Sequence, residues 1–202
     1  MGLRIECLKG DSIGSGVADL ARLRIRVFRA WPYLYDGDLA YEEAYLSGFA
    51  KGQTSVIVAA YDVDTIVGAA TGSPLEEHTA EFVPLFAGYG YRAENIFYCG
   101  ESVLLPEYRA QGIGHGFFDR REAHARELRD KLGYQFEYSS FCSVIREGGD
   151  LRCPPGYRPL DSFWEKRGYR KVAGMIGHYN WREIGQVSET RKPMQFWMRK
   201  LD

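Results

Sequence analysis

Apolar residues recur along the chain at spacings that change from helical to strand-like, and these spacings predict most of the elements. Residues 19–29 carry apolar side chains among arginines at helical spacing, and a Trp-Pro pair closes this segment. A second short helix is expected over residues 39–49. β-Branched and apolar residues at 54–61 and 65–71 flank a short acidic turn, a pattern typical of a β-hairpin.

The second half of the chain alternates between strand and helix patterns. A strand is expected at 96–105, and after a glycine-rich turn the residues of 112–132 show the apolar stripe of a helix that packs on a sheet. The order of elements predicts one α/β domain over residues 1–202 with a mixed sheet. The remaining predicted elements are a strand at 135–144, a short helix at 160–167 and strands at 170–181 and 194–199, with Pro- and Gly-containing insertions at about 75–92, holding a helical turn or two at 79–86, and 146–159.

Composition narrows the class of protein. The chain has 202 residues, of which 45% are hydrophobic and 26% charged, as expected of a globular domain. Its net charge of -1 argues against a nucleic-acid partner. The N-terminus lacks the long apolar segment of a signal peptide, so we expect a cytoplasmic protein with no membrane partner. The four cysteines form no C-x-x-C pair and are expected as free thiols, and neither they nor the histidines have the spacing of metal ligands.

A glycine-rich turn, RAQGIGHG from Arg109 to Gly116, joins an expected strand to an expected helix. Backbone N–H groups at the start of a helix, together with its dipole, bind anions such as phosphate. The turn lacks the Lys-Ser/Thr pair of a P-loop, because His115 and Gly116 stand there instead. Phe117 occupies the position where a dinucleotide motif needs its third glycine, so that interpretation is weak.

The same turn resembles the pyrophosphate loop of the GNAT acetyltransferase superfamily, whose pattern [RQ]-x-x-G-x-[GA] is met by Arg109, Gly112 and Gly114. The run from Glu101 into this loop and the later segment FWEKRGY at 163–169 resemble further signatures of the family, and the resemblance covers about residues 3–200. It implies a three-layer fold with a mixed central sheet of about six or seven strands, flanked by helices and splayed at the cofactor site.

The resemblance implies that acetyl-coenzyme A is the acyl donor and a co-substrate, with no metal. The pantetheine arm is expected between the splayed strands, the pyrophosphate at the amides of the glycine-rich turn, and the arginine of the turn is expected to add charge. The implied cofactor-binding residues are Val103, Leu104, Leu105, Arg109, Gln111, Gly112, Ile113, Gly114, His115 and Gly116.

Transfer of an acetyl group from a thioester to an amine requires a base, stabilisation of the carbonyl oxygen and release of the thiolate. By resemblance Glu101 is the candidate base, acting directly or through water, and a salt-bridged strand carboxylate is the alternative. The tyrosine that serves as general acid in the family is replaced by Trp164, whose indole N–H is not acidic. Tyr157 is the candidate substitute, with Tyr138, Tyr169 or solvent as alternatives.

On the acceptor side, Tyr33, Tyr35 and Asp36 follow the first helix, in a connection that walls the acceptor pocket in the resembling family. They are expected to hold a cationic amine, or alternatively to pack as an aromatic loop on their own domain. Cys142 is expected close to the acyl group, but no histidine or acid is placed to activate it, so direct transfer is favoured over an acetyl-cysteine intermediate. The 146–159 loop is a candidate lid.

Together these inferences predict an N-acetyltransferase that acts on a primary amine of a small or amino-acid-like molecule. The alternatives are a transferase for protein N-termini or lysines, and a non-catalytic coenzyme A sensor or interaction module. The final hairpin, with Phe196 and Trp197, would suit the interface of a homodimer.

Overall fold

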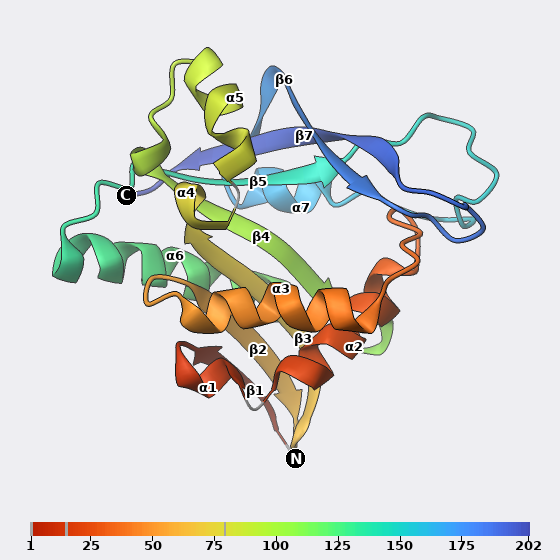
Figure 1. Ribbon diagram of the computed structural model, residues 1–202, viewed down its shortest axis with the longest axis horizontal. Coiled ribbons are helices and arrows are strands. Elements are labelled where there is room, and N and C mark those ends of the chain that lie inside the picture. The colour runs from red at the N-terminus through yellow and green to blue at the C-terminus, as the bar shows by residue number, and fades with distance from the viewer. Residues whose placement is uncertain (1, 15, 79) are drawn as a thin grey trace.

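Seven strands and seven α-helices build the structure, a computed structural model that describes residues 2–14, 16–78 and 80–202 (Figure 1). The strands are β1 (Leu3–Leu8), β2 (Val56–Asp62), β3 (Thr65–Pro74), β4 (Ile96–Leu104), β5 (Tyr138–Val144), β6 (Arg170–Trp181) and β7 (Thr190–Lys200). The helices are α1 (Asp11–Gly14), α2 (Val17–Phe28), α3 (Leu39–Lys51), α4 (Leu75–His78), α5 (Val83–Gly88), α6 (Ile113–Leu132) and α7 (Asp161–Lys166).

The strands form one mixed sheet in the order β1-β2-β3-β4-β5-β7-β6. All neighbours are antiparallel except β4 and β5, which run parallel and pair only from Ile96–Tyr98 to Tyr138–Ser140. Beyond these three pairs the two strands diverge, as Figure 1 shows. The mixed, splayed sheet expected from the sequence is therefore confirmed, and the facing edges of β4 and β5 lose their ladder partners where they part.

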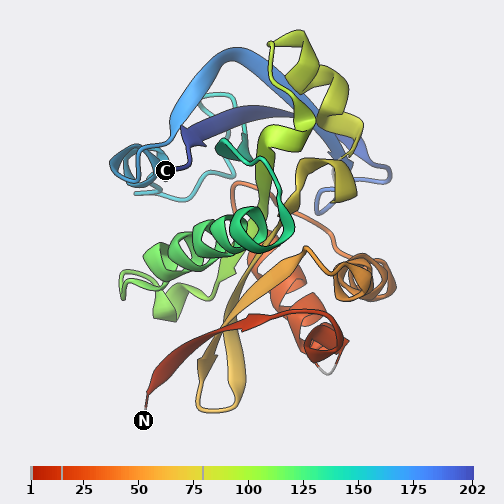
Figure 2. The same ribbon diagram turned by 90° about the vertical axis from the view of Figure 1, so that its left-hand side faces the viewer.

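Helices cover both faces of the sheet, which gives three layers. The helices α2 and α3 lie on one face and α6 on the other (Figure 2). The long helix α6 buries Phe117, Ala125 and Leu128, in the same core that holds Leu20 of α2 and Phe49 of α3. A second buried cluster lies under β6 and β7, where the insertion that follows β3 packs its aromatic residues.

A bulge in β4 determines which way its polar side chain points. Register with β3 runs from Ala70 opposite Ser102 to Gly72 opposite Cys99, so Gly100 and Glu101 both face Thr71. The extra residue redirects the strand, and the Glu101 side chain lies on the face covered by α2 and α3, where it contacts Arg24 and Tyr45.

A buried arginine of α6 supports this bulge from the opposite face. Arg121 is 1% exposed, and its Nη1 donates to the backbone oxygens of Thr71 at 3.2 Å and Glu101 at 3.1 Å. Carbonyl groups at a bulge lose their regular ladder bonds, and a buried carbonyl without a partner is costly. The guanidinium group therefore stabilises the backbone where the sheet begins to open.

Most predicted elements lie within two residues of their observed bounds, and the differences have physical reasons. The strand β1 was not predicted; it lies at the edge of the sheet, and four of its six side chains are exposed. The strand β7 begins at Thr190 rather than 194, because a charged stretch continues the ladder with β6. The strand β5 begins at Tyr138 rather than 135. The helical turns expected at 79–86 are α4, a 3-10 turn and α5, with residue 79 outside the described residues.

The final hairpin does not offer the surface that the homodimer prediction used. Phe196 and Trp197 are both 0% exposed within their own chain, on β7 in the middle of its pairing with β5 and β6. These two side chains belong to the core, and a homodimer stays a prediction without this support.

The contact between β3 and β4 leaves no room for a side chain at Gly72. A Cβ atom there would lie 2.8 Å from Cε1 of Phe97, which is fully buried, and 3.3 Å from Cδ of Arg121. We therefore expect Gly72→Ala to lower the free energy of unfolding by about 1–3 kcal/mol, the usual cost of overpacking a core.

Urea denaturation followed by circular dichroism measures this change. The control is Gly88→Ala, since no atom lies within 4 Å of a Cβ at that position. Equal stabilities of the two variants would contradict the close packing beside the bulge.

Candidate active site

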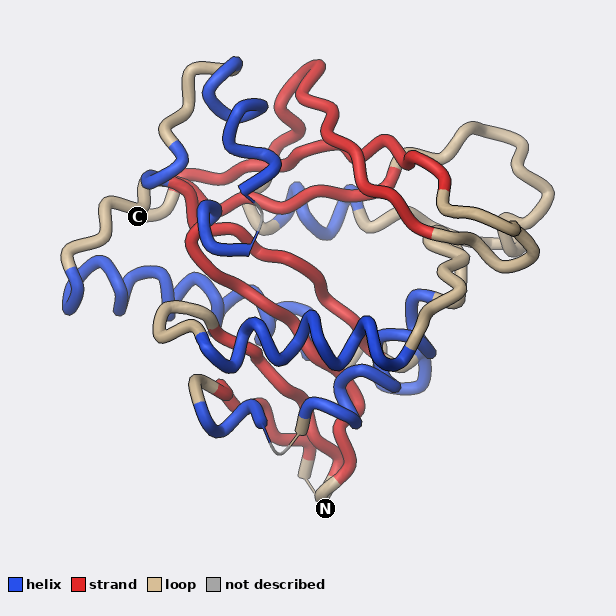
Figure 3. Tube along the Cα trace, in the orientation of Figure 1, coloured by secondary structure: helices blue, strands red, loops and turns tan. Residues whose placement is uncertain are grey.

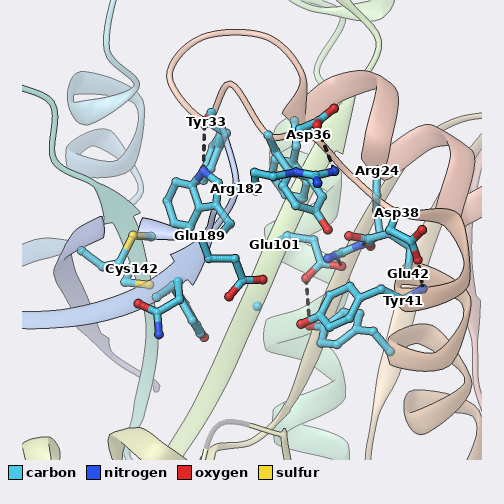
Figure 4. Close-up of a pocket in the computed structure, with 18 of the residues that line it drawn as sticks. Arg24, Tyr33, Asp36, Asp38, Tyr41, Glu42, Glu101, Cys142, Arg182 and Glu189 are labelled. Carbon is cyan, nitrogen blue, oxygen red and sulfur yellow. Dashed lines mark hydrogen bonds and ion pairs between the residues drawn. The ribbon is translucent and has the colours of Figure 1, made fainter. Parts of the chain in front are cut away.

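A cavity of about 850 Å³ lies between α2, α3, β4 and the hairpin of β6 and β7 (Figure 4). Five residues proposed from the sequence on separate grounds line it together, namely Tyr33, Tyr35, Asp36, Glu101 and Cys142. The structure thus brings the candidate base, the acceptor loop and the cysteine of β5 to one place.

The acceptor loop after α2 is held against β6 by its own backbone. The carbonyl of Tyr33 accepts from Trp181 Nε1 at 2.9 Å and Arg146 Nη2 at 3.0 Å. The N–H of Asp36 donates to the carbonyl of Arg182 at 2.9 Å. The loop therefore packs on its own domain, which was one of the two expectations from the sequence. Its side chains also line the cavity, as the other expectation, an acceptor pocket wall, requires.

Glu101 forms the floor of the cavity within a cluster of charged and hydroxyl groups. Its side chain is 10% exposed, contacts the guanidinium of Arg24, and accepts hydrogen bonds from Thr71 Oγ1 at 2.9 Å and Tyr45 Oη at 3.3 Å. Glu101 therefore forms a salt bridge with Arg24, which was the alternative to a catalytic role. The role of Glu101 as base stays a prediction.

Arg24 joins two carboxylates, since it also contacts Glu42 of α3. Burial alone would lower the pKa of Arg24, but the charges of Glu101, Tyr45 and Glu42 outweigh it and raise the pKa. The guanidinium is therefore charged and paired with both carboxylates, and it holds the cavity side of α2 to β4 and α3.

Sequence analysis missed Arg24 and Glu42, although the chain contains a signal for both. Leu20, Arg24 and Phe28 are four residues apart on α2, so the arginine lies on the apolar stripe. Glu42 precedes the buried Leu46 by four residues on α3. A charged residue on a buried stripe requires a partner of opposite charge, and two such residues on consecutive helices indicate a buried ion pair.

The glycine-rich turn has the backbone of an anion-binding helix start. Gly112 has a φ of +82°, and the first N–H to bond within α6 is that of Gly116, which donates to the Gly112 carbonyl at 3.1 Å. The N–H groups of Ile113, Gly114 and His115 precede it and have no carbonyl inside the helix to bond. The first turn of α6 also contains no acidic residue that would occupy this site.

Other residues of the turn serve packing. A Cβ at Gly116 would lie 2.6 Å from Cδ1 of Ile5, so this glycine admits β1 to the helix. The ring of His115 packs on Phe163, and its Nδ1 lies 3.3 Å from Arg167 Nη1. The Arg109 side chain and the Gln111 side chain are exposed, and Arg109 Nη2 lies 3.5 Å from the carbonyl oxygen of Leu104.

The backbone groups of β4 that face the gap differ in part from the expected ones, which were those of Val103, Leu104 and Leu105. The N–H of Leu105 already donates to the Val67 carbonyl at 3.0 Å, and Val103 pairs with Ala69. Because backbone groups alternate in direction along an antiparallel strand, the N–H and C=O of Leu104 and Ser102 point away from β3 and towards β5. Leu104 thus faces the gap as expected, and Ser102 is an addition that the register reveals.

The candidates for proton donor lie in different surroundings. Tyr157 is 38% exposed, packs edge-on against Trp31 at 6.1 Å and does not belong to the described lining of the cavity. Burial raises the pKa of Tyr157, and the charge of Arg109 opposes this. The hydroxyl of Tyr169 is engaged by Glu122 and Ser139, and Tyr138 packs edge-on against Tyr91. Trp164 packs against Phe141 and Trp197 as part of the core.

Tyr33 combines burial with a place in the cavity. Burial raises its pKa, the charges of Cys142, Tyr157 and Glu101 raise it further, and Arg146 acts in the opposite direction. The raised pKa makes this hydroxyl a weaker acid than a free tyrosine, and burial raises the pKa of the lining residues Tyr45 and Tyr179 in the same way. Tyr33 therefore lines the cavity without the surroundings of a good proton donor.

The loop expected as a lid is fixed at its base. Arg146 and Arg152 both contact the carboxylate of Glu183, each at 2.6 Å, and these ion pairs join the loop after β5 to the loop after β6. The backbones of the two loops lie at the same end of the molecule (Figure 3). The described lining of the cavity includes no residue of 146–159. The loop therefore supports the wall from outside.

Cys142 has the surroundings of an unreactive thiol. It is 9% exposed, and burial raises its pKa to about 12, while the hydrogen bond with Tyr98 Oη at 3.1 Å acts in the opposite direction. A thiol with this pKa is ionised in about one molecule in ten thousand at pH 8. The thiolate needed for nucleophilic attack is therefore essentially absent.

The arrangement of layers and the splayed strands can be compared with solved structures. An acetyltransferase from Streptococcus agalactiae superposes with a TM-score of 0.62 at 13% identity and covers 100% of this chain and 99% of its own. A GNAT-family acetyltransferase from Streptococcus pneumoniae gives 0.58 at 11% identity, with 100% of both chains covered. An N-acetyltransferase from Thermoplasma acidophilum, solved in complex with coenzyme A, gives 0.53 at 14% identity and 99% of both.

The chain therefore has the GNAT acetyltransferase fold over its whole length, and the resemblance seen in its motifs is confirmed at the level of the fold. No protein-family model matches the sequence, and no curated protein matches it either.

Two features are absent from the described residues. None of their helices has the length and apolar character needed to cross a membrane. None of their histidines, cysteines and acids gather in threes as a metal site would require.

Direct transfer makes a specific prediction for Cys142. We expect Cys142→Ala to keep kcat/KM for acetyl transfer within about threefold of the parent protein, because the neutral thiol forms no acetyl intermediate. Steady-state assays of thiol release measure this, and Cys99→Ala is a matched control, since it removes a second buried thiol on β4. An acetyl adduct on Cys142 in the mass spectrum, together with loss of turnover in the alanine variant, would establish the two-step route instead.

Proposed function

We propose that the protein is an acetyl-coenzyme A-dependent N-acetyltransferase that transfers the acetyl group directly to a primary amine of a small molecule. The observation that carries this proposal is the position of the β4–β5 gap. The start of α6 approaches it from one face of the sheet, and the cavity around Glu101 opens to it from the other. An acyl donor and an acceptor can thus meet without sharing a binding site.

The glycine-rich turn suits the phosphates of the donor. Its three N–H groups and the dipole of a 20-residue helix attract an anion, and Gly112 lets the backbone turn without a side chain over the site. The N-acetyltransferase from Thermoplasma acidophilum was solved with coenzyme A, and the shared fold supports the same ligand here.

The residues around the gap supply the remaining chemistry. The Glu101 carboxylate takes the proton that the amine loses as its nitrogen bonds to the carbonyl carbon. The free N–H of Leu104 donates to the carbonyl oxygen while negative charge develops on it. The C–S bond then breaks, and the thiolate takes a proton from solvent or from the candidate Tyr157.

A small acceptor fits the walls of the cavity. The loop after α2 and the hairpin of β6 and β7 are joined by backbone hydrogen bonds and by the ion pair of Asp36 with Arg182 at 3.0 Å. A protein chain would have to enter a space that these segments close from two sides. The small-molecule class is therefore favoured over protein N-termini and lysines.

A charge reversal at the turn tests the donor site. Asp and Asn both tolerate positive φ and both cap helices, so Gly112→Asp and Gly112→Asn differ mainly in charge. We expect the Asp variant to bind coenzyme A at least about tenfold more weakly than the Asn variant, because its carboxylate repels phosphate. Isothermal titration calorimetry measures the two dissociation constants. Equal values would show that the pyrophosphate does not bind at the turn.

The amide variant of the candidate base tests catalysis itself. We expect Glu101→Gln to lower kcat about 10²-fold with an amine panel, because an amide cannot take the proton, while coenzyme A affinity is unchanged. The matched control is Glu94→Gln, an exposed acid just before β4. Unaltered kcat would exclude Glu101 as base, and tight coenzyme A binding without any turnover in the parent protein would indicate a sensor instead.

A further inference from the structure

The cavity concentrates negative charge in a chain that is nearly neutral. The whole chain has a net charge of -1. The cavity lining has a formal charge of -4, because two guanidinium groups, those of Arg24 and Arg182, accompany six carboxylates. The six carboxylates are those of Asp36, Asp38, Glu42, Glu81, Glu101 and Glu189.

The two guanidinium groups are both engaged already. Arg24 is shared between Glu42 and Glu101. Arg182 pairs with Asp36, which also lies 3.5 Å from Arg29. The lining therefore offers no unpaired cation to an incoming carboxylate, and an acceptor that carries one would meet repulsion from the surrounding acids.

Three carboxylates of the lining have no cation of their own. Within residues 2–14, 16–78 and 80–202, no ion pair includes Asp38, Glu81 or Glu189. Asp38 accepts the N–H of Tyr41 at 2.8 Å as the cap of α3. Figure 4 shows Glu189 extending into the cavity from the side of β6 and β7, while Glu42 and Glu101 lie on the side of α3 and β4.

The floor and the opposite wall thus make different demands on a ligand. At the floor, the two carboxylates of Glu42 and Glu101 share one arginine, Arg24, and together have a net charge of -1. This charge attracts the ammonium group that is to lose its proton and react. On the side of β6 and β7, the unpaired carboxylate of Glu189 remains for a second positive charge. Between them the lining is aromatic, with Tyr33, Tyr35 and Tyr45 among others, and such rings pack against methylene groups and attract cations.

We propose that the acceptor is a small aliphatic di- or polyamine, with one primary amine at Glu101 and a second ammonium group held by the unpaired carboxylate of Glu189. This inference rests on the proposed function and narrows it, since it excludes acceptors with a free carboxylate. The amino-acid-like acceptors expected from the sequence are thereby set aside in favour of carboxylate-free polycations.

Three acceptors with the same four-carbon chain test the effect of the charge at their second end. With acetyl-coenzyme A as donor, kcat/KM should be at least about tenfold higher for 1,4-diaminobutane than for 1-aminobutane, and lowest for 4-aminobutanoic acid. The unpaired carboxylates are exposed, so the preference for the diamine should shrink between 0.05 and 0.5 M NaCl. Equal values for the diamine and the monoamine would overturn the inference.

A single variant locates the second charge. Glu189→Gln should raise KM for the diamine at least about fivefold and leave the monoamine unchanged, because only the diamine uses this carboxylate. The matched control is Glu147→Gln, an exposed glutamate of the loop after β5 outside the cavity lining. Equal effects of Glu189→Gln on both acceptors would overturn the assignment, as would faster turnover of a lysine-containing basic peptide than of the diamine.

A binding measurement keeps the two proposals apart. Calorimetry of 1,4-diaminobutane with the protein saturated by coenzyme A should show binding that Glu189→Gln weakens. Such binding without turnover of any amine would support the charge preference and contradict the acetyltransferase function. Turnover of monoamines with no binding preference for the diamine would support the acetyltransferase function and contradict the charge preference.

Discussion

The parting of β4 and β5 after three residue pairs is the constraint on which the rest of the molecule depends. A sheet that stops pairing in its middle leaves backbone groups without partners, and such groups are costly when buried. Two features limit this cost on the side of β4. The bulge at Gly100 and Glu101 bends the strand away, and Arg121 donates to the carbonyls that the bulge leaves free. The groups of Leu104 and Ser102 still face the gap, so the fold itself supplies a row of donors and acceptors for an extended ligand.

Beyond the gap, the shape of the cavity depends on one buried carboxylate. Glu183 is 2% exposed and contacts Arg146 and Arg152, each at 2.6 Å, and Lys192 at 3.4 Å. Burial alone would raise the pKa of Glu183, but its hydrogen bonds from the two arginines lower it overall. Arg146 also donates to the carbonyls of Pro32 and Tyr33. One acid thereby holds three segments that are far apart in the sequence, namely the loop after α2, the loop after β5 and the β6–β7 hairpin.

How far the sequence predicts this site depends on the range of the interactions. The turn at Gly112 was predictable because a strand, a glycine pattern and a helix are adjacent in the chain, and local spacing carries the signal. The core helices and strands were predictable because their periodicity is regular. Glu189 carries no such signal, since only the pairing of β7 with β5, on the far side of β4, brings the β6–β7 hairpin to the cavity. Arg24 lies between these cases, because its place on an apolar stripe shows that it is buried but does not name Glu101 as its partner.

The charges of the two sites also bear on how a reaction cycle would end. The proposed donor site would attract anions through N–H groups at the start of α6, and the proposed acceptor site would attract cations through carboxylates on the other face of the sheet. Acetylation converts an ammonium group into a neutral amide, so the product has one positive charge less than the acceptor that entered. The negative charge at Glu42 and Glu101 then loses its counterion, and the attraction that brought the acceptor to the floor of the cavity no longer holds the product there. Of the two charges that would hold a diamine, only the one at Glu189 would then remain, so the product would be held more weakly than the acceptor without any movement of the fixed loops around Glu183.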